Sequence, residues 1–335
     1  MEEKETRVII DNNCNLVYSS YYIYGLYKLL GKNNVHFETI DSCPTNLDGF
    51  RFLLFQGKEV LKIAISLSDS YIVNKDQYDW CDVYGSVNVN FAKTPKEFHN
   101  KLVALCPSFG IRCWSFLQTA CHAIANCPKD GIPIQNFLGK YRRLLIRPRY
   151  SQYLTHARPD DRYVFFLSTL WYNDEWNKND EGVNGRRANF IRACKSMDQV
   201  HFEGGLVSQG KERSSEDLFA DCLCEGVSMR AWMEKTKRSA LVFNTPAFWD
   251  CHGWKLGEYL ALGKCVVSTP LSNDLPAPLE HGRQIHYVEN DQEAMREAVE
   301  YIIDHPDYRK RLEQGAKAYW EQYGTPEASL RLLGL

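Results

Sequence analysis

The stretch from Asn244 to Pro270 constrains the fold of this chain more than any other segment. It reads NTPAFWDCHGWKLGEYLALGKCVVSTP and follows a short apolar run, Leu241–Phe243. That run and the later Cys265–Ser268 have the composition of short buried strands. Lys255–Leu262 has the spacing of a compact helix, which Gly263 ends. A strand, loop, helix and strand in this order predict a βαβ unit in a parallel sheet.

The loop of this unit, 245–252, is a natural place for an anionic ligand. Loops that follow parallel strands lie at the carboxyl edge of a sheet, where open α/β sheets bind ligands. The helix that follows presents unbonded N–H groups and a positive dipole end. Asp250 and Glu258 are eight positions apart, too far for a local pair that shares one metal ion or proton. We expect them to hold two ends of an extended ligand, with its phosphate groups over the backbone of 252–254.

This segment resembles the donor-binding motif of the sugar-nucleotide-dependent glycosyltransferases of the group 1, family 4-like type. These enzymes have the GT-B fold, an α/β fold in which two Rossmann-like, doubly wound domains face each other across a cleft. Their motif has an acidic residue, a glycine-rich loop, a helix with a second acidic residue, and a small-Gly-x-Pro-Val-Val-x-Ser stretch. Here the match consists of Asp250, Gly253, Glu258 and 261–268, which reads ALGKCVVS. It covers 163–323; the first half is similar by architecture alone.

The resemblance implies roles for individual residues. Glu258 matches the glutamate that holds the ribose hydroxyls, and Asp250 matches the acidic residue that faces the donor sugar. His252 and Lys255 stand where the family has Gly-Phe-Gly-Leu-Pro, and each can meet a phosphate group. We expect Lys255 to neutralise the leaving diphosphate and His252 to hydrogen-bond the sugar or phosphate. The alternatives are a helix N-cap for Asp250 and surface or packing roles for the others.

A second domain is predicted to begin after the breaks at Arg147–Arg149 and Arg158–Asp161. The strongly apolar run Tyr163–Leu167 then restarts the pattern as a buried strand. We therefore expect an N-terminal Rossmann-like domain at 1–150, on the acceptor side. The nucleotide-sugar-binding domain is expected at 151–323, and a C-terminal tail at 324–335.

The resemblance extends to the loop and helix after this strand. The family carries a loop Arg and a Lys at the start of the helix, which clamp the pyrophosphate. Ser168–Leu170 replaces the loop Arg here, and Arg186 or Arg187 is the candidate for the Lys, before a helix predicted at 188–197. A glycine turn that lets the nucleotide approach the backbone is predicted next. The remaining residues assigned to nucleotide-sugar binding are Gly204, Gly205, Asn244, Thr245, Gly253 and Trp254.

The first half alternates strands and helices in the order of a doubly wound domain. Strands are predicted at Arg7–Ile10, Val35–Ile40, Phe52–Phe55, Leu61–Ser66 and Trp80–Val89, and a helix at Ser19–Leu30. The loop 11–15 carries no glycine-rich fingerprint, so this half does not read as a nicotinamide-binding domain. Asp69, just after a strand, is a candidate general base, although a turn-forming aspartate is the more common explanation.

Length and charge narrow the class of protein. A chain of 335 residues suits two domains, and a net charge of −2 leaves no electrostatic footprint for nucleic acid. A basic cluster at Tyr141–Arg149 is the exception. A solvated helix end is the preferred interpretation, and a weak peripheral contact with a membrane or an acidic substrate is the alternative. The start MEEKETRVII has no signal-peptide pattern, so we expect a cytoplasmic protein, whose twelve cysteines are reduced.

We therefore expect a glycosyltransferase that moves a sugar from a UDP-, GDP- or ADP-linked donor to a glycan, a lipid-linked acceptor or another hydroxyl group. No cofactor and no metal ion are expected, because the sequence shows no Asp-x-Asp motif and no CxxC spacing. The resemblance favours retention of the anomeric configuration, because an acidic pair at this spacing is commonest in retaining members of the family. Two alternatives stay open: an epimerase or hydrolase of sugar nucleotides on the same fold, and a catalytically silent nucleotide-sugar-binding partner.

Overall fold

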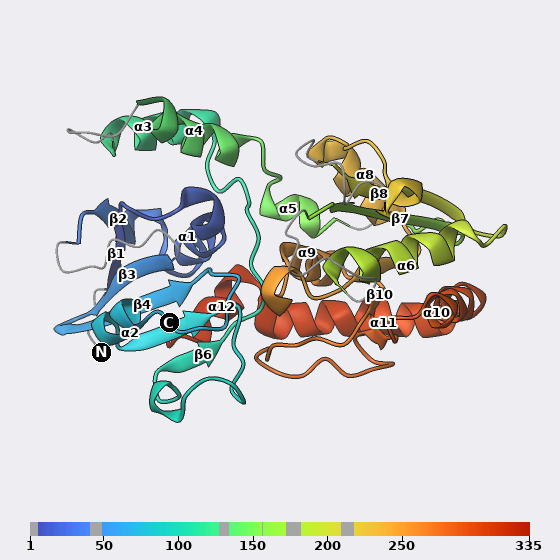
Figure 1. Ribbon diagram of the computed structural model, residues 1–335. Coiled ribbons are helices and arrows are strands. Elements are labelled where there is room, and N and C mark those ends of the chain that lie inside the picture. Colours follow the sequence, from blue (N-terminus) through green and yellow to red (C-terminus); the bar gives the residue numbers. More distant parts are fainter. Residues whose placement is uncertain (1–5, 41–48, 127–133, 156, 172–181, 209–217) are drawn as a thin grey trace. The chain divides into compact units, whose positions relative to one another are not determined.

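The computed structural model of the chain (Figure 1) describes residues 6–40, 49–126, 134–155, 157–171, 182–208 and 218–335. The chain divides into two compact units. Unit 1 comprises Met1–Tyr153, Asn273–Pro278 and Glu321–Leu335, and unit 2 comprises Leu154–Ser272 and Leu279–Trp320. Each unit combines a largely parallel sheet with helices, which confirms the α/β class.

Unit 1 is built on a six-stranded sheet in the order β2-β1-β3-β4-β5-β6. β1 and β2 are parallel, as are β4, β5 and β6, whereas β3 runs antiparallel to both of its neighbours. The strands are β1 (Thr6–Asp11), β2 (Val35–Glu38), β3 (Gly49–Gln56), β4 (Glu59–Ser66), β5 (Val83–Ser86) and β6 (Leu102–Ala104). The helices are α1 (Leu16–Leu30), α2 (Lys75–Trp80), α3 (Phe116–Ala125), α4 (Ile134–Leu145), α5 (Tyr150–Tyr153) and α12 (Pro326–Arg331).

The hairpin of β3 and β4 is where unit 1 departs from the doubly wound order that the sequence predicts. Only Gly57 and Lys58 separate the two strands, and Gly57 has a φ of 64°. Two residues suffice for a tight turn between antiparallel strands, but a parallel pair needs a crossover of a dozen or more. The predicted strands here are confirmed, while their direction makes the sheet mixed.

The C-terminal segment belongs to unit 1 and is ordered. A π-helix at Trp320–Gly324 leads into α12, which packs against α1. The approach is close, because a Cβ added at Gly25 would lie 2.7 Å from the carbonyl oxygen of Pro326. Tyr21 of α1 also donates a hydrogen bond to the carbonyl oxygen of Gly324. A helix thus stands where the sequence analysis predicts a tail.

In its described residues, unit 2 has five strands in two groups, and the strands within each group pair in parallel. β7 (Tyr163–Thr169) pairs with β8 (His201–Val207), and β10 (Val266–Ser268) pairs with β9 (Val242–Asn244) and β11 (His286–Tyr287). The two groups adjoin at β7 and the residues before β9, since Ala240 N–H donates to Tyr163 O at 2.7 Å. The helices are α6 (Val183–Lys195), α8 (Met229–Arg238), α9 (Trp254–Ala261), α10 (Gln292–Asp304) and α11 (Pro306–Tyr319). The predicted βαβ unit is therefore present as β9-α9-β10.

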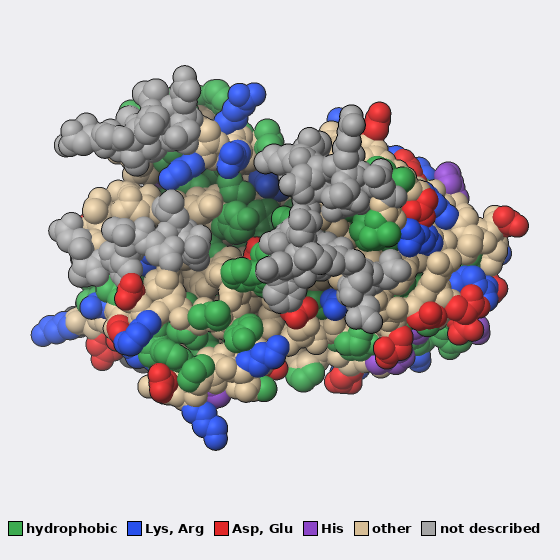
Figure 2. Space-filling view, in the orientation of Figure 1, with side chains coloured by type: hydrophobic (Ala, Val, Ile, Leu, Met, Phe, Trp, Pro, Cys, Tyr) green, Lys and Arg blue, Asp and Glu red, His purple; other side chains and the backbone are tan. Residues whose placement is uncertain are grey.

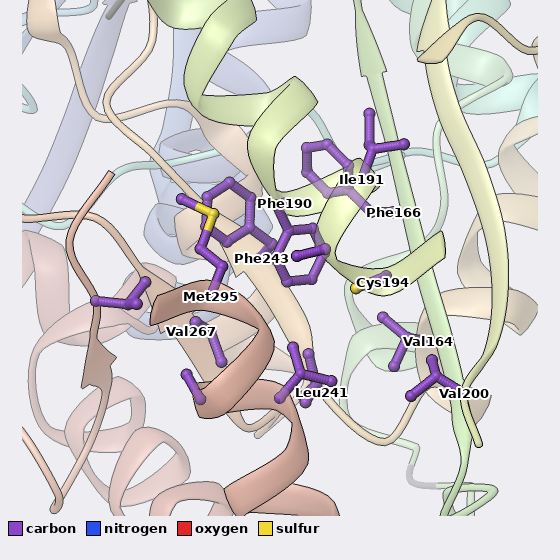
Figure 3. Close-up of a cluster of buried hydrophobic side chains, with 14 of the residues drawn as sticks. Val164, Phe166, Phe190, Ile191, Cys194, Val200, Leu241, Phe243, Val267 and Met295 are labelled. Atoms are coloured by element: carbon purple, nitrogen blue, oxygen red, sulfur yellow. The ribbon is translucent and has the colours of Figure 1, made fainter. Parts of the chain in front are cut away.

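The core of unit 2 (Figure 3) joins the strands to the helices that flank them. Phe190 of α6 stacks on Phe243 of β9 with ring centroids 4.2 Å apart, and Phe166 of β7 meets both rings edge-on. Burying one such ring contributes about 1.5–3 kcal/mol. This aromatic packing sets the position of the carboxyl ends of β7 and β9.

Candidate functional site

The candidate site is a pocket of about 320 Å³ within unit 2. It lies at the carboxyl ends of β7 and β9 and at the amino ends of α6 and α9, where a parallel α/β sheet binds ligands. Its lining residues come from these four elements and the loops between them: Phe166, Ser168, Thr169, Trp171, Arg187, Phe243, Asn244, Thr245, Ala247, Gly253, Trp254 and Lys255.

The two helices that begin at the pocket have no side-chain caps. Gly182 is the N-cap of α6 and Gly253 is the N-cap of α9, so neither cap offers a side-chain acceptor to the first turn. In the same unit, Ser228 caps α8 and Asp291 caps α10 with side-chain hydrogen bonds. The first N–H groups of a helix need partners. At α6 and α9, a bound anion can supply them.

Lys255 stands in the first turn of α9, and its ammonium enters the pocket. Nζ donates to Ser168 Oγ at 3.0 Å and lies 5.8 Å from the centroid of the Phe166 ring. Burial and the nearby charge of Arg187 lower the pKa of Lys255 to about 7, and the charge of Glu258 offsets only part of that. The positive charge of Lys255 is therefore only partly compensated by nearby negative charge.

Arg187 approaches the pocket from near the start of α6, as the fifth residue of that helix. Its side chain is buried, and Nη1 donates to the carbonyl oxygen of Thr169 at 2.8 Å. Burial lowers the pKa of Arg187 to about 10. Among the described residues, no ion pair joins Arg187 or Lys255 to a carboxylate.

Among the residues that the structure describes, the pocket thus combines two cations with a lining that has no Asp or Glu. Two cations in one partly dehydrated space repel each other and lose hydration, and both effects favour loss of a proton. A ligand with two negative charges would reverse both effects. The arrangement is suited to a diphosphate, because a guanidinium, an ammonium and two helix N-termini converge on the same space.

Gly253 contributes open space to this lining. Its φ of −72° suits any residue, and an added Cβ would meet only the Cβ of Ala247 at an ordinary 3.7 Å. The fold therefore tolerates a side chain here, and the space that a Cβ would take belongs to the pocket.

Gly204 and Gly205 differ from Gly253 in this respect. They lie inside β8, with φ values of 112° and 152°, so the predicted glycine turn is wrong. Added Cβ atoms would lie 2.0 Å from Phe166 O and 2.3 Å from Cys222 O. Close packing of β8 accounts for both glycines, and their contact with a nucleotide stays a prediction.

Asn244 and Thr245 tie the floor of the pocket to β10. Asn244 Nδ2 donates to Ser268 Oγ at 3.0 Å, and the hydroxyl groups of Thr245 and Thr269 are 2.8 Å apart. All four side chains are buried, so these bonds hold the ends of β9 and β10 together. Both predicted residues line the pocket from this fixed position.

The loop between β9 and α9 holds Asp250 in an unusual backbone conformation. Trp249 and Asp250 have φ values of 54° and 59°, in the left-handed region that side chains other than Gly, Asn and Asp rarely adopt. Asp250 is not the N-cap of α9, which is Gly253. Its carboxylate lies 3.8 Å from the guanidinium of Arg186, and both groups are partly exposed. Backbone strain of this kind is concentrated at ligand sites.

Trp171 forms one side of the pocket mouth and is held by Asn184 of α6. The buried amide of Asn184 accepts from Trp171 N–H at 3.1 Å and donates to Trp171 O at 2.7 Å. The Trp171 ring stacks on Phe248, which stacks on Trp249. An aromatic row therefore runs from the pocket to the loop that carries Asp250.

The other predicted residues are not among those that line the pocket. Glu258 is buried on α9, with 7% of its surface exposed, so the alternative of a solvated helix face does not hold. His252 is also buried, at 4% exposure. Asp69 belongs to unit 1 and is exposed at a bend after β4. Within the described ranges, no group of three His, Cys, Asp or Glu side chains is arranged to hold a metal ion.

The start of α6 and two partners of the cations were missed in the sequence analysis. α6 begins at Val183, not at Ala188, so Arg186 and Arg187 are its fourth and fifth residues. Ser168 and Thr169 accept hydrogen bonds from the two cations. Their place at the carboxyl end of the buried strand β7 was a usable signal. The middle of the preceding loop, 172–181, lies outside the described residues.

No family model matches the chain, and no curated protein sequence matches it. Solved structures align with it at low identity. A glycosyltransferase from Rickettsia africae has 11% identity and a TM-score of 0.44, over 80% of this chain and 68% of that one. HepE from Anabaena, in complex with UDP-glucose, has 10% identity and a TM-score of 0.43, over 77% and 64%.

A UDP-GlcNAc 2-epimerase from Neisseria meningitidis, bound to UDP-GlcNAc, has 14% identity and a TM-score of 0.40, over 77% of this chain and 71% of that one. For three of the aligned proteins, the alignment spans 60%, 68% and 51% of their length. The aligned structures thus include glycosyltransferases and an epimerase of nucleotide sugars. At TM-scores below 0.5, the function must rest on the chemistry of the pocket.

Proposed function

We propose that this protein is a glycosyltransferase that takes a sugar from a nucleotide-sugar donor and transfers it to a hydroxyl acceptor, a glycan or a lipid-linked sugar. The observation that carries the proposal is the pairing of Lys255 and Arg187 in one pocket, where the described lining residues include no carboxylate. A diphosphate bound there would meet both cations and the uncapped starts of α6 and α9.

Lys255 and Arg187 would act on the leaving group. When the bond between the anomeric carbon and the diphosphate oxygen breaks, its electron pair stays on that oxygen, and negative charge grows there. The pKa of Lys255 is about 7, and the growing negative charge beside this side chain favours its charged ammonium form. Because these side chains supply the positive charge, the proposed reaction needs no metal ion.

The remaining roles follow the motif. Glu258 would accept hydrogen bonds from the ribose hydroxyls, and Asp250 and His252 would meet the sugar. Trp254, Asn244, Thr245 and the open space at Gly253 would shape the site around the nucleotide. The acceptor oxygen forms the new bond to the anomeric carbon and gives its proton to a base, for which Asp69 is the candidate.

A ligand screen tests the donor site. UDP, GDP, ADP and CMP at millimolar concentration are compared by thermal unfolding, because a ligand of the native state alone raises the midpoint. UDP-glucose and UDP-GlcNAc follow as donors. We expect one nucleoside diphosphate to raise the midpoint of the wild type and of Lys237→Met, which changes a half-buried lysine outside the pocket. The absence of a shift with every nucleotide would contradict the donor site.

Gly253→Val gives a second test that leaves the cations in place. The backbone at Gly253 accepts a side chain, so the unfolding midpoint without ligand should stay near that of the wild type. The added methyl groups enter the pocket, so the midpoint shift with the nucleotide should disappear. An unchanged shift would place the nucleotide elsewhere.

Product analysis separates transfer from the alternatives. A glycosyltransferase releases nucleoside diphosphate in proportion to a glycosylated acceptor, whereas an epimerase or hydrolase changes the donor without an acceptor. Binding without turnover of any donor, in the presence of a panel of glycan and lipid-linked acceptors, would leave only a binding partner.

A further inference from the structure

Helix α3 of unit 1 exposes an apolar face. Leu117 and Ile124 are 74% and 78% exposed, and the exposed Cys121 lies between them at helical spacing. Phe116, at the first position, is 72% exposed. The helix contains no charged residue, as its sequence FLQTACHAIA shows. A helix on a water-exposed surface normally has the opposite pattern, with its apolar side inward.

The inner face of α3 is the polar one, and it is fixed. Thr119 is buried and donates from its hydroxyl group to the carbonyl oxygen of Ser115 at 2.8 Å. The ring of His122 stacks on Trp114 at 4.0 Å, with 18° between the planes. Ser115 caps the helix in a complete capping box with Gln118. These contacts prevent the helix from rolling its apolar face inward.

Helix α4 places positive charge beside this face. Tyr141 of α4 donates to the carbonyl oxygen of His122 at 3.3 Å, which joins the two helices. Arg142 and Arg143 are exposed on α4, and the large apolar side chains of Leu138 and Ile146 are exposed with them. Figure 2 shows several Lys and Arg side chains around α4.

The charge of this region has one sign. From Ser115 to Arg149 the sequence has Lys129, Lys140, Arg142, Arg143, Arg147 and Arg149 as basic residues, and Asp130 as its single acidic one. In the described parts of α3 and α4, no ion pair neutralises the arginines. An apolar surface with a basic margin complements the interface of a bilayer that contains anionic lipids.

We propose that α3 and α4 form a docking surface for an anionic membrane, with Phe116, Leu117 and Ile124 entering the interface and Arg142 and Arg143 contacting lipid phosphates. This goes beyond the proposed function, because the surface belongs to unit 1 and the pocket to unit 2. The contact is interfacial, since no described helix is long and apolar enough to cross a bilayer. The sequence analysis assigns the basic cluster at 141–149 to a solvated helix end. With the apolar face beside it, this cluster is instead proposed to bind lipid phosphates.

Vesicle sedimentation with the full chain tests the proposal. Vesicles of phosphatidylcholine alone are compared with vesicles that contain phosphatidylglycerol, at low and high salt. We expect binding to the anionic vesicles only, and weaker binding at high salt. Arg142→Gln combined with Arg143→Gln should weaken it about 25-fold, since each basic residue contributes about fivefold near an anionic surface. Leu117→Gln combined with Ile124→Gln should weaken it by at least about tenfold.

Matched controls use equally exposed residues elsewhere. Ile72→Gln removes an exposed apolar side chain of unit 1, and Arg230→Gln combined with Arg283→Gln removes two exposed arginines of unit 2. These variants should bind vesicles like the wild type, and all variants should keep the wild-type unfolding midpoint. An environment-sensitive dye on Cys121 should brighten with anionic vesicles, and Cys121→Ser shows whether the signal comes from that thiol.

Three outcomes would overturn the proposal. They are the absence of vesicle binding, equal binding to neutral vesicles, and wild-type binding by the arginine variant. Sedimentation equilibrium tests the alternative that a second copy of the chain binds this face. A dimer that Leu117→Gln dissociates, without any vesicle binding, would assign this face to self-association. Because nucleotide binding is measured separately, failure here leaves the proposed function untouched.

Discussion

Arg51 of unit 1 and Lys255 of unit 2 both lie beside the carboxyl end of a parallel strand, but their partners differ. Arg51 donates from Nε and Nη2 to Asp11 Oδ2, at 3.2 and 2.9 Å, and both side chains are buried. Lys255 donates to the neutral hydroxyl group of Ser168, and its neighbour Arg187 donates to a backbone carbonyl.

The difference distinguishes a structural cation, whose charge the protein itself compensates, from a cation whose charge a ligand would compensate. The carboxylate of Asp11 compensates the cost of burying Arg51, so that pair is complete without anything else. Burial lowers the pKa values of both Lys255 and Arg187, and their hydrogen-bond partners supply no charge that would offset this. We expect substitutions in the buried ion pair of unit 1 to reduce stability. Substitutions of the two pocket cations of unit 2 should reduce ligand binding or turnover.

The largest expected effect is on the stability of unit 1. Asp11→Ala leaves Arg51 buried and unpaired, so we expect the free energy of unfolding to fall by about 3–5 kcal/mol. Lys255→Met, which removes a partly dehydrated charge from unit 2, should cost less than about 1 kcal/mol. Urea denaturation of the wild type and of both variants measures the two losses of unfolding free energy. A loss for Lys255→Met as large as that for Asp11→Ala would mean that Lys255 is structural.

The next largest effect is on turnover. Lys255→Met should slow sugar transfer at saturating donor by about 100-fold, as for one electrostatic contact to a developing charge. Donor affinity should fall less, because the charge on the leaving diphosphate grows only as the glycosidic bond breaks. Lys237→Met is the control, as its lysine also has a lowered pKa through burial but lies outside the pocket. Unchanged turnover would remove Lys255 from the reaction.

The βαβ unit around the pocket was predictable because its signals are local. Leu241–Phe243 and Cys265–Ser268 are continuous apolar runs, and Gly263 ends the helix between them. The start of α6 was not predictable in this way, since its N-cap is Gly182, and no Ser, Thr, Asp or Asn marks the boundary.

Features that depend on packing between distant segments could not be predicted from the sequence. Ser168 meets Lys255 across 87 positions of the chain, and only the adjacency of β7 and β9 makes that contact. The face of α3 is a stronger case. Spacing at Leu117, Cys121 and Ile124 indicates an apolar stripe, and periodicity alone assigns such a stripe to the core. The structure exposes it because Trp114 holds the opposite face.

A smaller effect is expected on nucleotide affinity at Glu258. Glu258→Ala removes two hydrogen bonds from the ribose hydroxyls to a charged acceptor, so affinity for the nucleoside diphosphate should fall by about 30-fold. Asp250→Ala should leave that affinity nearly unchanged and lower turnover instead, because Asp250 is assigned to the sugar. Calorimetric titration with the diphosphate measures both. Equal affinity for the wild type and Glu258→Ala would show that the ribose assignment is wrong.

The smallest effect is a pH dependence that belongs to Lys255. Its pKa is about 7, and a bound diphosphate would favour the charged form and raise that pKa. The contribution of Lys255 to affinity is therefore complete below pH 7 and is lost as pH rises toward the pKa of the complex. At pH 8, affinity should be about tenfold below its plateau, one pH unit above the pKa of the free site.

Titration between pH 7 and 9 isolates this group, because the phosphate of the ligand, with a second pKa of about 6, is already ionised there. Binding should take up a proton in this range, which calorimetry in buffers of different ionisation enthalpy detects. Lys255→Met should bind with flat pH dependence and without proton uptake, whereas Lys237→Met should behave like the wild type. If Lys255→Met kept the pH dependence, another group would be responsible. Arg187, whose pKa of about 10 lies above the titrated range, stays charged throughout and does not account for it.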